Sequence, residues 1–196
     1  FLVINRGESP RVVRDVFTLP ESAGGGTVAR SLAIGFSNSH NLLLDLDRAN
    51  LAMWTFGDFA TQRTQGKSWF WDMAGRLVLT GGERRGDVVL VIVDGAGKPI
   101  SVHRPLKDMV TAARLIGYQQ DEEGAVDVFY ELQFAVGKKR YTVRVSELLQ
   151  PTPAREVSKG TSGWDRDVSV SVTKPQQGQL GGFPKGVEFY IGRPTA

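Results

Sequence analysis

The chain contains no cysteine. Disulfides, zinc sites built on thiolates, iron–sulfur clusters and haem attachment through C-x-x-C-H are therefore excluded within this chain. The compartment stays open, because many domains of oxidising compartments also lack cysteine. Histidine is scarce too, with only His40 and His103. A serine nucleophile would have to use one of these two as its base, and no G-x-S-x-G motif accompanies either of them.

Strong net charge and long apolar runs are also missing. The formal net charge is +3, and lysine and arginine are spread along the chain without a basic block. This distribution gives little support to nucleic-acid binding, and we expect none. No apolar run approaches the ~18 residues of a membrane-spanning helix, so we expect no membrane span.

The bulk composition is that of an ordinary globular domain. The chain has 196 residues, of which 41% are hydrophobic and 23% charged. This length suits one long domain with a core of its own, so we expect residues 1–196 to form a single domain. Because the chain begins at Phe1 rather than at methionine, we expect a processed protein or a piece of a larger multidomain protein.

Short segments of alternating apolar residues recur along the chain. Residues 28–36 alternate as a strand packed on one face. Residues 42–46 place Leu42, Leu44 and Leu46 on one face and Leu43 and Asp45 on the other, and residues 87–94 form a β-branched run typical of a strand buried on both faces. Residues 110–118 and 126–134 flank QQDEEG and predict a hairpin. We expect one buried face to contain Val126, Val128, Tyr130, Leu132 and Phe134, with Val143 and Val89 as neighbours.

No segment predicts an α-helix of three turns. The best candidate, SELLQ, runs directly into Pro151. About ten strands with short turns indicate an all-β protein, and we predict an antiparallel two-sheet sandwich of the jelly-roll or mutarotase-like kind. No repeat of 20–50 residues indicates a propeller. We expect residues 148–163 to form a surface loop.

Residues 33–75 are the aromatic centre of the chain and contain three of its four tryptophans. We predict a long aromatic loop around TQRTQGKSWFWDM, between two strands. Indole faces stack on sugar rings, and amide or charged groups bond sugar hydroxyls. Tryptophans at i and i+2 share one face of an extended chain. The predicted ligand-binding residues are Trp69, Trp71, Trp54, Gln62, Arg63 and Asp72. Two alternatives stay open, namely core packing of these rings and a protein–protein surface.

Catalytic and metal motifs are incomplete. A turn histidine that caps local backbone explains His40 more simply than a catalytic base does, and we predict no catalytic residue, no metal and no cofactor. SNSHN followed by DLD offers His40, Asp45 and Asp47 to a cation. The hairpin tip offers a second acidic group, but neither group has the spacing of a calcium loop; this tip contains Asp121, Glu122 and Glu123.

An enzyme is the rival interpretation. A glycosidase needs two carboxylates at a defined separation in space, which the sequence does not give. The carboxylates near the aromatic residues are Asp45, Asp47, Asp58 and Asp72. A polysaccharide-active enzyme that uses carboxylates on a sheet face therefore stays as the alternative.

Two segments carry a family resemblance. VARSLAIGF…NLLLDLDRANLAMWTFGDFATQ…W and, later, ARLIGYQQDEEGAVDVFYEL resemble an uncharacterised β-domain of large exported bacterial proteins. That domain accompanies c-type cytochrome modules and glucose/sorbosone-dehydrogenase-like modules. The matching features are residues 33–36, 47–54, 57–59 and 117–130, and the resemblance covers about the middle two-thirds of the chain.

This resemblance implies an exported, periplasmic or secreted accessory domain without catalysis of its own. Its partner would be a carbohydrate or a protein, such as a cytochrome or quinoprotein module of a sugar-oxidising, electron-transport assembly. Because this chain has no haem-attachment cysteine, we do not expect it to transfer electrons alone. A structural subunit that docks a redox protein is a further alternative.

Overall fold

The computed structural model describes residues 2–4, 9–47, 50–65, 67–80, 88–93, 99–105, 110–136, 139–153, 162–172 and 187–191. These residues form strands and one short 3-10 helix, η1 (Glu21–Ala23). In the described part of the chain, no helix is long and apolar enough to cross a membrane. The predicted all-β antiparallel sandwich is confirmed. The described residues hold 17 strands rather than about ten, because several strands are only two or three residues long.

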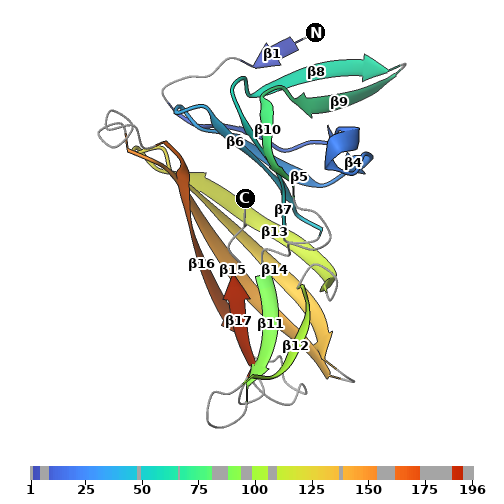
Figure 1. The fold of residues 1–196 in the computed structure, drawn as a ribbon, viewed down its shortest axis with the longest axis vertical. Helices are drawn as coiled ribbons and strands as arrows, with labels where there is room; N and C mark the ends of the chain where they lie inside the picture. Colours follow the sequence, from blue (N-terminus) through green and yellow to red (C-terminus); the bar gives the residue numbers. More distant parts are fainter. Residues whose placement is uncertain are drawn as a thin grey trace.

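The strands form four sheets, which Figure 1 shows in an elongated molecule. The cap sheet has the order β1 (Leu2–Ile4), β8 (Ala60–Gln65), β9 (Ser68–Met73), β3 (Phe17–Thr18), β4 (Thr27–Val28). The central sheet has the order β10 (Arg76–Thr80), β7 (Asn50–Phe56), β6 (His40–Asp45), β5 (Ser31–Gly35), β2 (Arg11–Val13). The long sheet contains β13 (Val110–Gln120), β14 (Val126–Val136), β15 (Lys139–Pro151) and β16 (Trp164–Val172). The small sheet contains β12 (Pro99–Pro105), β11 (Val88–Val93) and β17 (Val187–Ile191).

The central sheet is buried on both faces, so the sandwich has three layers at this point. One face packs on the long sheet through Leu42 and Leu44. The other face packs on the cap sheet through Ala33 and Leu43. The prediction that residues 28–36 form a strand packed on one face is therefore wrong, whereas Leu42 and Leu44 do lie on the face opposite to Leu43, as predicted. Three consecutive leucines in β6 pack into two different cores, because successive side chains of a strand point to opposite faces.

The segment 28–36 is also divided. β4 ends at Val28 and belongs to the cap sheet, whereas β5 begins at Ser31 and belongs to the central sheet. Val28 consequently packs in the core beneath the cap sheet, on the side opposite to Leu32 and Ile34. A strand that changes sheets in this way keeps an alternating sequence while its side chains enter different cores.

The long sheet contains the hairpin predicted from the sequence. β13 pairs with β14 on either side of the turn, and β14 pairs with β15. Val143 and four predicted members of the buried face are in one core cluster, namely Val126, Val128, Tyr130 and Leu132. The side chains of Phe134 and Val89, and the burial of residues 88–93, lie outside the described part. The first four residues of the predicted surface loop, 148–151, belong instead to β15, and residues 154–161 lie outside the described part.

Candidate functional site

The predicted long aromatic loop is a hairpin. β8 and β9 pair antiparallel from Ala60↔Met73 to Gln65↔Ser68. The prediction of a loop is therefore wrong, because the polar residues of TQRTQ and the rings of SWFWDM alternate as the two faces of paired strands. Figure 1 shows the hairpin projecting at the upper end of the molecule. Its register is regular, so residues at alternate positions share a face.

The inner face of the hairpin contains Trp71, which belongs to the core. Its side chain is 6% exposed and stacks on Phe17 at a centroid distance of 6.2 Å and an interplanar angle of 22°. β3 pairs parallel with β9 at this point, with Phe17 opposite Trp71. The indole Nε1 of Trp71 donates to Oδ2 of Asp15 at 2.9 Å. Trp71 is therefore not available as a flat platform for a ligand.

Trp69 lies on the same inner face, two residues closer to the hairpin tip, and is 60% exposed. Its cross-strand partner is Thr64, which is exposed, and Gln62 occupies the next position on this face, opposite Trp71. The core cluster under the cap sheet includes Trp71 but not Trp69. The inner face is thus covered at one end and open at the other.

The outer face of the hairpin carries a different group. Arg63 Nε lies 2.7 Å from Oδ2 of Asp72, and Arg63 Nη2 donates to Oγ1 of Thr18 at 2.9 Å. The Nε–H has no aligned acceptor, so the Arg63–Asp72 contact is an ion pair without a hydrogen bond at that atom. The guanidinium carbon also lies 5.8 Å from the centroid of Phe70. Arg63 and Asp72 therefore face away from Trp69 and do not join it in one site.

Trp54, the remaining predicted ligand residue, lies in β7 of the central sheet, in a second aromatic cluster. Its indole Nε1 donates to Nδ1 of His40 at 3.0 Å, and its ring meets Trp164 of β16 edge-on at 5.8 Å. The ring of His40 also lies edge-on to Phe56 at 5.0 Å. His40 is buried at the start of β6. It is therefore not the turn histidine that was predicted.

The hydrogen bonds of His40 define its tautomer. An indole N–H can only donate, so Nδ1 of His40 carries a lone pair and the neutral ring carries its proton on Nε2. Nε2 lies 3.0 Å from Oγ of Ser162, so the ring donates to this hydroxyl. A base that activates serine must instead accept a proton from it. The pair is arranged in the opposite sense to a nucleophilic serine site.

Three of the four carboxylates near the aromatic residues have structural partners. Oδ1 of Asp45 accepts from the backbone N–H of Asp47, and Oδ1 of Asp47 lies 2.9 Å from Nη1 of Arg30. Asp72 pairs with Arg63 as described, and Asp58 is exposed in the turn before β8. Within the described residues, no three histidine or acidic side chains gather as a metal site would require. His103 lies in β12, and its side chain is outside the described part.

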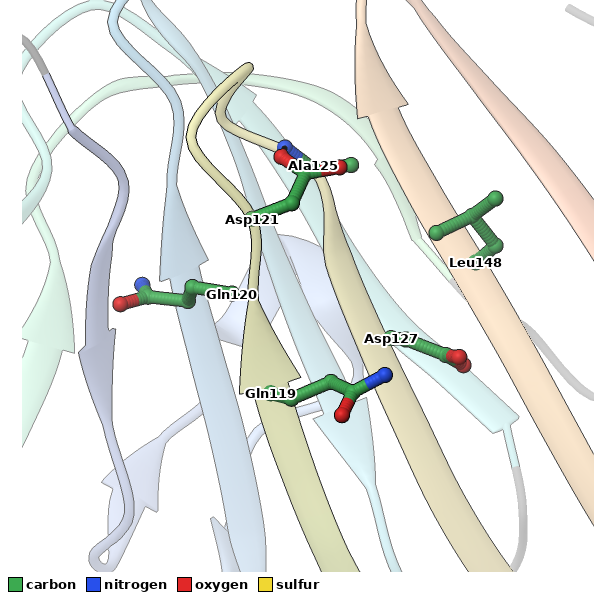
Figure 2. A pocket seen from close by; sticks show the side chains of 6 residues that line it. All are labelled: Gln119, Gln120, Asp121, Ala125, Asp127 and Leu148. Carbon is green, nitrogen blue, oxygen red and sulfur yellow. Dashed lines mark hydrogen bonds between the residues drawn. The ribbon is translucent and has the colours of Figure 1, made fainter.

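The acidic hairpin tip adjoins a small pocket of about 210 Å³. Figure 2 shows Asp121 next to Ala125 near the turn, and the cross-strand partners Gln119 and Asp127 further along the two strands. Both carboxylates are already acceptors, since Asp121 caps the N–H of Ala125 and Asp127 accepts from Ser146, each at 2.7 Å. Glu122 and Glu123 are exposed in the turn. These contacts define a capped, solvated hairpin tip.

A buried polar group centred on Glu147 was not predicted from the sequence. Glu147 is 1% exposed, and its carboxylate accepts from the hydroxyl of Tyr130. Arg166 donates to the same carboxylate from Nη2 at 2.8 Å and from Nε at 3.1 Å. A signal was available, because Glu147 occupies an inward position in the alternation of Val143, Val145 and Leu149. The three partners come from β14, β15 and β16, so the group ties three strands of the long sheet together.

Comparison of the chain with protein-family models, curated proteins and solved structures finds no match. The resemblance to the β-domain of cytochrome-containing proteins therefore stays a prediction. Of the six predicted ligand residues, only Trp69 and Gln62 lie at the open inner face of the hairpin. Thr64 and Asp15 were missed, because their proximity to the tryptophans depends on strand pairing.

Proposed function

We propose that this chain is a non-catalytic β-sandwich module that binds carbohydrate through the inner face of the β8–β9 hairpin. The observation that carries this proposal is the 60% exposure of Trp69 on a regular strand. An indole exposed to this degree loses favourable apolar burial, and large exposed aromatics are common at binding surfaces. A sugar ring laid on the indole restores that burial.

The surroundings of Trp69 support a sugar as the ligand. Thr64, opposite Trp69, is exposed and brings a hydroxyl that can donate and accept, and Gln62 brings an amide with the same double capacity. Sugar hydroxyls also donate and accept, so such groups suit them. Arg63 and Asp72 lie on the other face and are paired with each other. The ligand face therefore combines one apolar plane with neutral polar groups.

The remaining chemistry supports binding without catalysis. His40 donates to Ser162 rather than activating it, because Trp54 occupies its Nδ1. Asp45, Asp47 and Asp72 are engaged in a turn or in ion pairs with arginine. A glycosidase needs an acid and a base that face the scissile bond from either side. The contacts of Asp45, Asp47 and Asp72 engage these three carboxylates in the fold instead.

The setting of the module is part of the same proposal. By its resemblance, the chain is an exported, periplasmic or secreted accessory domain beside cytochrome or quinoprotein modules that oxidise sugars. A sugar-binding accessory domain would raise the local concentration of substrate for such modules. Docking of a partner domain on Trp69 is the other outcome of the test below.

The test is binding of the purified chain to a panel of insoluble and soluble polysaccharides. Trp69→Ala should abolish binding and leave the melting temperature unchanged, because substitutions at exposed positions alter stability little. Tyr118→Ala is the matched control, since Tyr118 is an exposed aromatic of the long sheet, 43% exposed. It should retain full binding. A wild-type chain that binds no polysaccharide, or a Trp69→Ala variant that still binds, would contradict the proposal.

A further inference from the structure

We propose that Asp15, oriented by Trp71, is the hydroxyl-binding acceptor of the Trp69 site, and that this site takes a single neutral pyranose ring. The inference rests on the proposed function and deepens it. Asp15 is exposed, and it lies just before β3, the strand that pairs parallel with β9. It was not among the residues predicted from the sequence.

The position of Asp15 follows from the pairing of β3 with β9. Phe17 lies opposite Trp71, and the backbone N–H of Trp71 donates to the carbonyl of Val16 at 3.0 Å. The contact between Oδ2 of Asp15 and Nε1 of Trp71 places the carboxylate at the inner face of the hairpin. Trp69 is two residues from Trp71 along the same face, so the Cα atoms of the two tryptophans lie about 7 Å apart by the rise of a strand. We expect the hydroxyls of a pyranose ring on Trp69 to reach the carboxylate that the Trp71 indole holds.

The carboxylate of Asp15 is fixed before any ligand arrives. Oδ1 accepts from the N–H of Val16 at 2.8 Å, and Oδ2 accepts from Trp71 at 2.9 Å. The backbone carbonyl of Asp15 accepts from Oγ of Ser31 at 2.6 Å. Each carboxylate oxygen can accept a second hydrogen bond. The acceptors are therefore held in place and still have lone pairs for ligand hydroxyls, which lowers the entropic cost of binding.

This arrangement gives the two tryptophans different roles. Trp69 stacks on the ligand, whereas Trp71 is a positioning residue, because its buried indole holds Asp15 without touching the ligand. With Trp71 buried under Phe17, only one indole remains to stack. The site thus offers one stacking surface, which suits one ring rather than two consecutive rings. Affinity should then be independent of the length of an oligosaccharide.

A cationic ligand fits this site less well. A carboxylate next to an indole also suits an ammonium group, through an ion pair and a cation–π contact. Lys67, however, is exposed at the tip of the same hairpin, two residues before Trp69, and brings a positive charge there. Thr64, the cross-strand partner of Trp69, offers a hydroxyl rather than a second aromatic wall. A neutral polyhydroxylated ring meets these groups without charge repulsion.

The test is calorimetric titration of the whole chain with the methyl glycosides of glucose, galactose and mannose and with their oligosaccharides. At least one methyl pyranoside should bind, with an affinity within a few-fold of its oligosaccharides. Asp15→Ala should weaken this binding by about tenfold or more, as expected for loss of a charge-assisted hydrogen bond. Asp58→Ala is the control, an exposed aspartate at the other end of the hairpin, and should bind like the wild type.

The variant Trp71→Phe distinguishes the hydrogen bond of Trp71 to Asp15 from the packing of its ring on Phe17. It keeps an aromatic ring beside Phe17 but removes the N–H that holds Asp15, so it should weaken binding in the wild-type background and have no further effect in the Asp15→Ala background. Asp15→Ala binding within twofold of wild type, while Trp69→Ala abolishes it, would overturn this inference and leave the proposed function standing. Affinity that rises steeply with oligosaccharide length would overturn the single-ring site. A wild-type chain that binds no sugar at all would overturn both proposals.

Discussion

Gly35 of β5 lies directly beneath the ring of Phe59, and a Cβ at Gly35 would come within 2.6 Å of two ring carbons. Phe59 is 1% exposed, so its ring has no free space into which to move. This contact brings the start of the cap-sheet hairpin down onto the central sheet. The close approach is possible only because position 35 has no side chain.

Gly35→Ala should therefore destabilise the protein by about 1–3 kcal/mol through overpacking. The measurement is the free energy of unfolding from urea denaturation. Gly117→Ala is the control, because a Cβ at Gly117 of β13 meets no atom within 4 Å. It should change stability by less than about 1 kcal/mol. Equal effects of the two substitutions would contradict the close packing of Phe59.

The two faces of the central sheet can be compared at neighbouring residues. Leu42 and Leu43 are both 0% exposed, but Leu42 packs toward the long sheet and Leu43 toward the cap sheet. Replacement of either by alanine should cost about 2–5 kcal/mol, as for other buried leucines. A sandwich of only two layers would lose stability at one of these positions and almost none at the other, so a cost below about 1 kcal/mol for Leu43→Ala would contradict the third layer.

Glu147 and Arg166 form a buried ion pair, with their side chains 2% and 11% exposed. Glu147→Gln should cost about 3–5 kcal/mol, because it removes the charge of the buried carboxylate that accepts two hydrogen bonds from Arg166. The double replacement Glu147→Leu with Arg166→Met should recover much of this loss, since both buried charges are then gone. Chemical denaturation gives the free energy of unfolding of the wild type, of Glu147→Gln and of the double variant.

The more exposed pair of Arg114 and Glu131 provides the control for this prediction. Its atoms are 3.6 Å apart, and Arg114 is 69% exposed. Arg114→Ala should cost less than about 1 kcal/mol, as surface ion pairs do. A Glu147→Gln variant that is no less stable than Arg114→Ala would show that the buried group contributes nothing to the folded state.

The tautomer of His40 can be observed directly. Because Trp54 donates to Nδ1, the neutral ring should carry its proton on Nε2. Nitrogen-15 NMR of the histidine rings distinguishes the two tautomers by their chemical shifts. Trp54→Phe removes the donor and should release this preference. An Nδ1-protonated ring in the wild-type protein would reopen the possibility that His40 activates Ser162.

The strands of the long sheet were predictable because each alternates along one buried face, as Val126, Val128, Tyr130 and Leu132 do. β6 contains three consecutive leucines, and its sequence predicted Leu42 and Leu44 on one face and Leu43 on the other, but not the second covering sheet. A run of consecutive apolar residues packs into two cores and is typical of a strand covered on both faces. Alternation alone cannot distinguish a face that meets solvent from one that meets a second sheet.

The β8–β9 hairpin could be predicted from the sequence, but the different exposure of its two tryptophans could not. Two residues separate Gln65 from Ser68, a spacing that suits a tight hairpin turn and that could have predicted β8 and β9. The shared face of Trp69 and Trp71 was predicted correctly from their i and i+2 spacing. Their different exposure depends on Phe17, which reaches Trp71 through the parallel pairing of β3 and β9. Pairing between segments so distant along the chain has no local signal.

The most direct test of ligand stacking on Trp69 is iodide quenching of tryptophan fluorescence, with and without the methyl pyranoside that binds. Trp69, the 60% exposed indole, should be strongly quenched in the free protein, and bound sugar should shield it. The same titration of Trp69→Phe should show weak quenching that the sugar does not change. Quenching of the wild-type protein that stays the same at saturating sugar, or an equal protective effect in Trp69→Phe, would contradict the claim that the ligand stacks on Trp69.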